Sequence, residues 1–350
     1  MGAPVSAESA VAIVPCKGYG AEVRPALARS FDLLGGIGSL VKGKTVTVKL
    51  NLTGTDFSQF LGRPVGETFM THYDTAAALA GLFFEAGVKR IRFVESTTSR
   101  AALGETLSLA DWDLKQLQGL GAVEFENTRN LGWGKSYAHL KVPSGGLMFS
   151  SFEFNRAYAD TDVLVSLAKL KTHITAGVTL SMKNLFGITP NALYGSAAGS
   201  EDATEGRGEL HTPEKKLKLP GQKEGITSIE AGWRVPRIIS DICGARPIHL
   251  AIVDAITSCS GGEGPWCRDA GPMKFTQPGV IIAGLNPVCT DAVGTAVMGF
   301  SNPRATKGTK PFETCDNHIL FAEEAGLGTA DLSRIEVRGL PIEKARCPYI

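Results

Sequence analysis

The sequence predicts an α/β protein with a mostly parallel β-sheet flanked by helices. Short apolar runs alternate with segments whose apolar residues recur at helical spacing. Glycine makes up 41 of the 350 residues, well above an average usage of roughly 7%, and suits tight strand-to-helix turns. The hydrophobic content of 43% is enough for a large core. We expect one α/β domain over residues 1–350, with two lobes, 1–160 and 161–350, and a site between them as the alternative.

The expected strands are short runs rich in apolar and β-branched residues. A strand, a helix and a second strand follow one another between residues 45 and 94, which is the pattern of a βαβ unit with a right-handed crossover. Residues 122–150 are expected to form further short strands or hairpins. The main strands are expected at Val11–Pro15, Thr45–Leu50, Arg90–Val94, Asp162–Ala168, His249–Val253, Gly279–Ala283 and Arg334–Val337.

The expected helices are clearest at Thr71–Ala86, where apolar residues recur at helical spacing and Gly87 follows as a C-terminal stop. Residues 101–120 predict one or two short helices. Residues 195–225 are polar and glycine-rich without apolar periodicity, so we expect a flexible lid or loop there. Residues of a lid, such as Arg207 and His211, can complete a site on closure, but a lone histidine there is more often simply solvated. Further helices are expected at Val23–Leu34, Ile229–Ile242, Pro287–Met298 and 315–325.

Charge and cysteine content exclude several classes of protein. The 36 basic and 35 acidic residues leave a formal charge of +1, which argues against a general binder of nucleic acid or anionic membranes. No apolar run reaches transmembrane length. The seven cysteines include no Cys-x-x-Cys pair and their number is odd, which argues against an iron–sulfur cluster within this chain and favours reduced thiols in a cytoplasmic protein.

The segment 169–187 is the most informative part of the chain. It places three lysines, one histidine, one asparagine and four hydroxyl residues directly after an expected buried strand, a composition that indicates an anion-binding site. Lys171 and Lys183 would hold a carboxylate or phosphate, and His173, with an ordinary pKa near 6.5, would transfer a proton. Lys169, Lys171 and His173 alternate, so they would share one face of an extended segment. The alternative is a set of surface lysines and a histidine that caps a backbone carbonyl.

Other polar residues are expected to contact the bound molecule. Thr175 and Thr179 stand four apart, so they would line one helical face and donate to an oxyanion, or else bond their own backbone at a helix start. Asn184 would contact the ligand or cap the local backbone. Asn51 follows an expected strand, and ligands of α/β sheets sit beyond the carboxyl ends of the strands. Lys169 belongs to this ligand-contacting set as well.

Three carboxylates and a glycine-rich loop complete the expected site. Asp254 ends an expected strand, and with Glu263 and Glu95 it could form a site for a hard cation, or it could cap the next element. Gly262 and Gly264 would wrap a ligand with backbone amides, or form a tight turn. The chain has no P-loop, no dinucleotide-binding glycine motif after a strand and no Gly-x-Ser-x-Gly elbow, which argues against the enzyme classes that use them.

A string of residues connects the chain to a known family. The string runs Lys169-Leu-Lys171-Thr-His173, then Thr179, then Lys183-Asn184-Leu-Phe-Gly187, and the motifs 48–51, 252–256, 262–265, 286–293 and 325–328 accompany it in order. Over roughly residues 40–340 this pattern resembles the bacterial and archaeal family catalogued as domain of unknown function 362. The resemblance implies an α/β domain of unsettled activity. Many relatives carry a ferredoxin-like segment with clustered cysteines and are labelled iron–sulfur proteins, whereas this chain has no such segment.

The sequence therefore predicts an enzyme that acts on a small anionic molecule, bearing a carboxylate or a phosphate, through a Lys/His site. Assistance by a divalent or transition metal is one variant of this hypothesis, and the lysine and histidine content is compatible with a nickel cofactor of the kind that lactate racemases hold. The alternative is a binding or carrier module for an anion or a metallocofactor that serves a redox partner protein. The sequence names neither the substrate nor the reaction.

Overall fold

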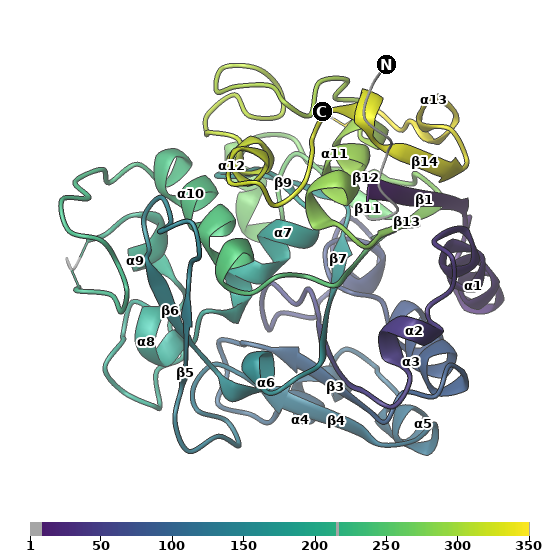
Figure 1. Ribbon diagram of the computed structural model, residues 1–350, viewed down its shortest axis with the longest axis horizontal. Helices are drawn as coiled ribbons and strands as arrows, with labels where there is room; N and C mark the ends of the chain where they lie inside the picture. Colours follow the sequence, from purple (N-terminus) through teal and green to yellow (C-terminus); the bar gives the residue numbers. More distant parts are fainter. Residues whose placement is uncertain (1–8, 215–216, 350) are drawn as a thin grey trace.

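The computed structural model describes residues 9–214 and 217–349. Its centre is an eight-stranded sheet with the strand order β14-β1-β13-β10-β7-β2-β3-β4 (Figure 1). All neighbouring pairs from β10 through β7, β2 and β3 to β4 are parallel, as is β1 with β14, and only β13 runs antiparallel to both of its neighbours. The predicted α/β class with a mostly parallel sheet is confirmed. The strands are β1 (Ala10–Pro15), β2 (Thr45–Lys49), β3 (Arg90–Glu95), β4 (Val123–Asn127), β7 (Val163–Lys169), β10 (Leu250–Ala255), β13 (Val280–Gly284) and β14 (Glu336–Gly339).

Side-chain caps mark where several of the helices begin, including α3 and α11. The Asn286 side chain accepts from the backbone N–H groups of Val288 and Cys289, and Pro287 occupies the first helical position of α11. At α3, His72 accepts from the N–H of Asp74. The helices are α1 (Val23–Leu33), α2 (Gly38–Val41), α3 (Tyr73–Glu85), α4 (Leu103–Ser108), α5 (Leu114–Gly119), α6 (Arg156–Ala159), α7 (Ser181–Asn184), α8 (Asn191–Tyr194), α9 (Gly208–His211), α10 (Ala231–Ala245), α11 (Pro287–Val297), α12 (His318–Glu324) and α13 (Ile342–Ala345).

A hydrophobic core lies on each face of the sheet. Strand β7 shows this directly, because Leu164 packs into one core while Val163, Val165 and Leu167 pack into the other. Helices α1 and α3 cover one face, and α7, α10 and α11 cover the other (Figure 1). A strand buried on both faces is continuously apolar, which is why the sequence shows β7 as an unbroken hydrophobic run. Strands from both halves of the chain join in this one sheet.

The segment after β7 differs from the expected helix. It forms a hairpin of β8 (Lys171–His173) and β9 (Gly177–Thr179) before α7 begins. Gly177 has a φ of +75°, which a glycine adopts without strain at the tight reversal. Thr175 therefore lies in the turn and Thr179 in a strand, so the prediction that they line one helical face was wrong. Two further two-stranded sheets pair β5 (Ala138–Lys141) with β6 (Ser151–Phe154) and β11 (Ser258–Ser260) with β12 (Lys274–Thr276).

The strand order reverses between β2 and β7. The chain proceeds from β2 to β3 and β4 on one side, and from β7 to β10 on the other. In open α/β sheets, a crevice outside the carboxyl ends of the strands at such a reversal is the usual place for a ligand. Within residues 9–214 and 217–349, no helix is both long enough and apolar enough to cross a membrane.

Candidate functional site

A cavity of about 240 Å³ lies at the carboxyl ends of β2 and β3. The end of β2 contributes Lys49 and the next residues contribute Asn51, while β3 contributes Glu95. The β8–β9 hairpin adds His173 and Thr179 to the wall. The cavity therefore borders the reversal between β2 and β7, through Lys49 at the end of β2 and the hairpin that follows β7. The remaining walls come from α7, from the segment before and within α9, and from the loop after β11.

Lys183 on α7 brings an unpaired cation to this cavity. Its side chain lines the wall, and its Nζ makes no hydrogen bond or ion pair with any described residue. The ammonium lies 4.5 Å from the centroid of the Phe186 ring. Burial lowers the pKa of Lys183 to about 7, with the Glu263 carboxylate raising it and the cations Lys171 and Arg207 lowering it. Near neutral pH, Lys183 is therefore present both as ammonium and as amine.

His173 is held as a hydrogen-bond donor. The backbone N–H of Thr175 donates to its Nδ1 over 3.2 Å, so the proton of the neutral ring lies on Nε2, 3.8 Å from Oε1 of Glu263. Burial lowers the pKa of His173 well below 6.5, and repulsion by Lys183 lowers it further. At neutral pH the ring is uncharged and presents an N–H group.

His211 on α9 is held in the opposite tautomer. Its Nδ1 lies 2.8 Å from the carbonyl oxygen of Arg207, which can only accept, so Nδ1 carries the proton and Nε2 a lone pair. The ring packs edge-on against Phe186 with centroids 5.0 Å apart. Burial lowers its pKa to about 4, and Lys183 adds to this effect. The cavity thus contains one imidazole that donates and one that accepts.

Glu263 supplies a carboxylate opposite His173. The Ile174 N–H donates to its Oε2 over 3.1 Å, and the Trp266 indole donates to its Oε1 over 3.2 Å. Burial by itself raises the pKa of Glu263, but the interactions with His173, Ile174 and Trp266 prevail and lower it to about 2. The Cys267 thiol also lowers this pKa, so Glu263 is ionised at neutral pH.

Lys49 and Glu95 form a buried ion pair at the floor of the cavity. Their Nζ and Oε1 lie 2.6 Å apart, and their side chains are 2% and 3% exposed. The N–H groups of Leu52 and Ser96 also donate to Glu95, over 2.7 and 3.0 Å. A Cβ at Gly187 would lie 3.0 Å from the Lys49 Nζ, so the backbone there packs directly on the pair. The two charges cancel.

Arg207 adds a second cation with a free donor. Its Nε and Nη2 donate to the carbonyl of Thr189 over 2.8 and 2.6 Å, and Nη2 also donates to the carbonyl of Gly187 over 3.0 Å. Its Nη1 has no partner in the described part of the chain. The guanidinium plane is therefore fixed, with one NH₂ group left for a ligand.

Two uncharged polar atoms in the wall lack partners. The Asn51 Oδ1 and the Thr179 Oγ1 are buried, and neither has a hydrogen-bond partner among the described residues. An unsatisfied buried polar group costs about 1–3 kcal/mol. Such atoms in the wall of a cavity are those that a bound molecule would satisfy. Asn184, the third predicted contact, lines the cavity too, but its amide is bonded to the Lys49 carbonyl and to Ser166.

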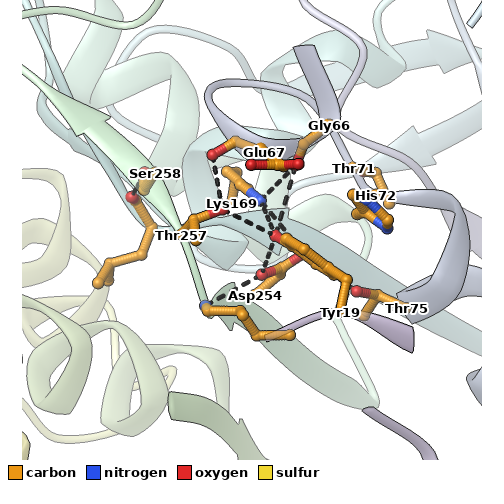
Figure 2. A network of polar contacts seen from close by, with 12 residues as sticks. Tyr19, Gly66, Glu67, Thr71, His72, Thr75, Lys169, Asp254, Thr257 and Ser258 are labelled. Atoms are coloured by element: carbon orange, nitrogen blue, oxygen red, sulfur yellow. Dashed lines mark hydrogen bonds and ion pairs between the residues drawn. The ribbon is translucent and has the colours of Figure 1, made fainter. Parts of the chain in front are cut away.

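Lys169 and Asp254 belong to a separate network, shown in Figure 2. The Lys169 Nζ lies 2.5 Å from the Tyr19 hydroxyl and 3.3 Å from the Asp254 carboxylate, and the Tyr19 hydroxyl lies 3.0 Å from Asp254 Oδ1. Thr75 donates to the same carboxylate over 3.0 Å, and the His72 ring stacks on Tyr19 with centroids 3.5 Å apart. Lys169 and Asp254 do not line the cavity.

Lys171 and two glycines of the loop, Gly262 and Gly264, lie outside the cavity wall and stabilise the backbone next to it. The Lys171 Nζ donates to the carbonyl oxygens of Phe69 and Glu263 over 2.6 and 3.0 Å and does not line the cavity. The N–H of Gly262 donates to the Thr172 hydroxyl, and a Cβ at Gly264 would collide with the ring of Trp266. Lys171, Gly262 and Gly264 were predicted to contact the ligand. Instead, they hold the loop that carries Glu263 in place. Gly262 lines a neighbouring cavity of about 420 Å³ that shares His173 with the first.

Of the three carboxylates of the expected metal site, Glu95 and Glu263 line the same cavity, whereas Asp254 does not. Glu95 pairs with Lys49, Asp254 with Lys169, and Glu263 faces His173. In the part of the chain that the structure describes, no group of three or more His, Cys, Asp or Glu side chains could hold a metal ion. Glu95 and Asp254 each have a lysine partner, whereas Glu263 faces the neutral ring of His173.

The sequence analysis missed the role of Lys49, and it did not assign residues 195–225 to any wall of the cavity. A lysine inside an otherwise buried strand was the available signal for Lys49, because such a residue needs a partner. Arg207 and His211, from the expected lid, line the cavity beside His173. Positions 215 and 216 of that expected lid lie outside the described residues. Nothing in the sequence indicated that Trp266 lines the cavity, apart from its position next to the glycine loop.

Comparison with solved structures gives distant likenesses. A crystal structure of a protein from Thermotoga maritima matches with a TM-score of 0.36 at 13% identity, covering 70% of this chain and 51% of that one. The lactate racemase apoprotein from Thermoanaerobacterium thermosaccharolyticum matches with a TM-score of 0.40 at 12% identity, covering 72% of this chain and 50% of that one.

Comparison of sequences places the chain in a family. It is 30% identical over 161 residues to a thylakoid-associated protein of Synechocystis sp. (strain ATCC 27184 / PCC 6803 / Kazusa), covering 46% of this chain and 44% of that protein. The match thus spans less than half of that relative's length. The family model described as Domain of unknown function (DUF362) matches residues 46–296, which include β2, the β8–β9 hairpin, α7 and the Glu263 loop. Because this match covers well over half of the chain, the protein belongs to the DUF362 family.

Proposed function

We propose that this protein is an enzyme that acts on a small anionic molecule, bearing a carboxylate or a phosphate, in the cavity at the end of β2. The observation that carries the proposal is the set of unpaired groups in the cavity wall. The Lys183 Nζ and the Arg207 Nη1 are cationic donors without partners among the described residues, and the Asn51 Oδ1 and Thr179 Oγ1 are buried and unsatisfied.

The size and charge of the cavity support a small anion. A volume of about 240 Å³ lies below the roughly 300–1,000 Å³ typical of sites for drug-sized ligands. Glu95 cancels the charge of Lys49, and Glu263 opposes only one of the two remaining cations, Lys183 and Arg207. The net charge of the cavity wall is therefore positive. An anionic group would satisfy the free donors, and a hydroxyl or amino group of the same molecule would satisfy Asn51.

The two imidazoles favour catalysis over simple binding. His173 presents an N–H group and His211 presents a lone pair in the same cavity, because each ring has its Nδ1 fixed by a backbone partner. A donor and an acceptor at one ligand allow a proton to be removed at one atom and supplied at another. A carrier protein would need the cations but not this pair.

Ligand-induced stabilisation tests the anion site. Small carboxylates and phosphates should raise the melting temperature of the unmodified protein and of the control variant Lys89→Met, which changes an exposed lysine. They should not raise that of Lys183→Met, because it lacks one of the two free cations. Equal stabilisation of Lys183→Met, or no stabilisation of the unmodified protein by either class of anion, would contradict the proposal.

A second experiment separates an enzyme from a carrier. His173→Gln and His211→Gln keep polar side chains of similar size but cannot cycle a proton. Anions that stabilise the protein would be incubated with it, and their conversion would be followed by nuclear magnetic resonance. An enzyme should convert at least one of them, and both variants should bind it and lose turnover. Binding without conversion by the unmodified protein would instead indicate a carrier of the same anion.

A further inference from the structure

We propose that Lys183 is a covalent catalyst, which forms a Schiff base with the carbonyl group of a small oxo acid or oxo phosphate bound in this cavity. The inference rests on the proposed function, since it names the substrate class of the same site. It adds a reacting atom, the Lys183 Nζ, to a site so far described by binding and proton transfer.

Lys183 differs from the other lysines around the site in its contacts. The Lys49 Nζ is bonded to Glu95 and to the carbonyl of Leu50, and the Lys169 Nζ to Tyr19, Gly66 and Asp254. The Lys171 Nζ donates to two backbone carbonyls. The Lys183 Nζ has no acceptor among the described residues and lines the cavity. An amine that attacks a carbonyl carbon must have its lone pair free, and this geometry leaves it free only at Lys183.

The surroundings of Lys183 favour the amine over the ammonium. Burial lowers its pKa from 10.5 to about 7, with Glu263 raising it and the nearby cations Lys171 and Arg207 lowering it. Lysines that are desolvated or placed beside another cation are the ones that enzymes use as nucleophiles toward carbonyl substrates. About half of the Lys183 side chains would therefore be reactive at neutral pH.

Apart from the attack of the amine, imine formation requires only proton transfers, and side chains in the cavity can accept and return these protons. The reaction therefore needs neither an oxidant nor a metal. The Lys183 ammonium gives one proton to the His211 Nε2, and the resulting amine adds to the carbonyl carbon while the His173 N–H supports the developing oxyanion. The extra proton on the nitrogen then passes to the oxygen to give the carbinolamine. His211 returns its proton to that hydroxyl, which leaves as water while the nitrogen lone pair forms the C=N bond. One ammonium and one carbonyl become one protonated imine and one water. The Arg207 Nη1 and the Thr179 hydroxyl would hold the anionic group.

Reductive trapping tests the inference. The protein is incubated with glyoxylate or with glycolaldehyde phosphate in the presence of cyanoborohydride, and modified peptides are quantified by mass spectrometry. Lys183 should be modified roughly 500-fold faster than the exposed Lys89 at pH 7, because about half of it is amine there, against a fraction on the order of 10⁻³ for an ordinary lysine. The rate at Lys183 should rise with pH and be half-maximal near its pKa of about 7. Lys171 serves as an internal control, because its pKa is lowered to about 8 but its Nζ is bonded to two carbonyls.

The controls separate this inference from the function on which it rests. Lys183→Arg keeps the cation but cannot form an imine, so it should still bind oxalate or phosphate by calorimetry and should lose the trapped adduct. Lys89→Arg should change neither. Modification of Lys183 no faster than of Lys89, in a protein that binds the anions, overturns the Schiff base alone. Failure of the unmodified protein to bind any of these anions overturns the proposed function as well.

Discussion

Asp291 of α11 caps α7, the helix that carries Lys183, by accepting from Ser181. Its Oδ1 accepts from the backbone N–H and the hydroxyl of Ser181 over 2.9 and 2.5 Å, and its Oδ2 accepts from the N–H of Met182 over 2.9 Å. Asp291 is fully buried, and burial raises its pKa to about 7 even though these three donors lower it. The helix that carries Lys183 is thus held by an acid whose pKa lies near 7.

This arrangement predicts a pH-dependent contribution to stability. The pKa of Asp291 is higher in the folded protein than the ordinary 3.8, so the folded state binds the extra proton and is favoured below that value. As the pH rises from about 4 to 7, this contribution is lost, up to about 4 kcal/mol at 1.36 kcal/mol per pKa unit. Asp291→Asn should therefore flatten the dependence of the unfolding free energy on pH between about pH 4 and pH 7, measured by urea denaturation. Parallel profiles for both proteins would show that Asp291 does not titrate in this range.

The unsatisfied Thr179 predicts a conflict between stability and binding. Thr179→Val has the same shape but removes the buried hydroxyl, which has no partner among the described residues. The variant should be more stable than the unmodified protein by about 1 kcal/mol without ligand, because a buried unpaired polar group is lost. It should also bind small anions more weakly, because a donor is lost. A less stable variant with unchanged anion affinity would place Thr179 outside the binding site.

The pKa of Lys183 sets the direction of the pH dependence of anion binding. Lys183 is charged below its pKa of about 7 and neutral above it, so affinity for oxalate should fall as the pH rises through this value. Lys183→Arg should bind with little change across the same range, because a guanidinium keeps its charge. Calorimetric titrations at several pH values measure the oxalate affinity of the unmodified protein and of the variant. Trapping of a carbonyl compound should show the opposite trend, since it requires the amine.

The network around Tyr19 should affect stability and leave the cavity unchanged. Burial and the Asp254 carboxylate raise the pKa of Tyr19 well above 10, so its phenol stays protonated and can donate to Asp254 while accepting from Lys169. Tyr19→Phe should cost about 1–3 kcal/mol of unfolding free energy, because two charged partners lose a hydrogen bond in a buried setting. Anion affinity should stay within error of the unmodified protein. A large loss of affinity at full folding would connect this network to the site.

The order of elements was predictable because its signals are local. The apolar run of β7, the helical spacing of α3 and the stop at Gly87 appear within short windows of sequence, and the structure places these elements within a few residues of the prediction. The parallel sheet followed from the βαβ pattern, and the position of Asn51 after a strand placed it at the edge where ligands bind. The β8–β9 hairpin was missed, because its strands are only three residues long and the spacing of Thr175 and Thr179 also fits a helix.

The sequence by itself determined that a cluster of lysines, one histidine and hydroxyl groups lies at the carboxyl edge of a parallel sheet. Only the tertiary structure decided which of these groups lacks a partner among the described residues. Lys169 and Lys171 find acceptors on segments distant in the chain, at Asp254 and at the Phe69 carbonyl, whereas Lys183 finds none in the described residues. A buried charge takes whichever partner the fold brings within reach, and that partner depends on long-range packing that no local pattern encodes.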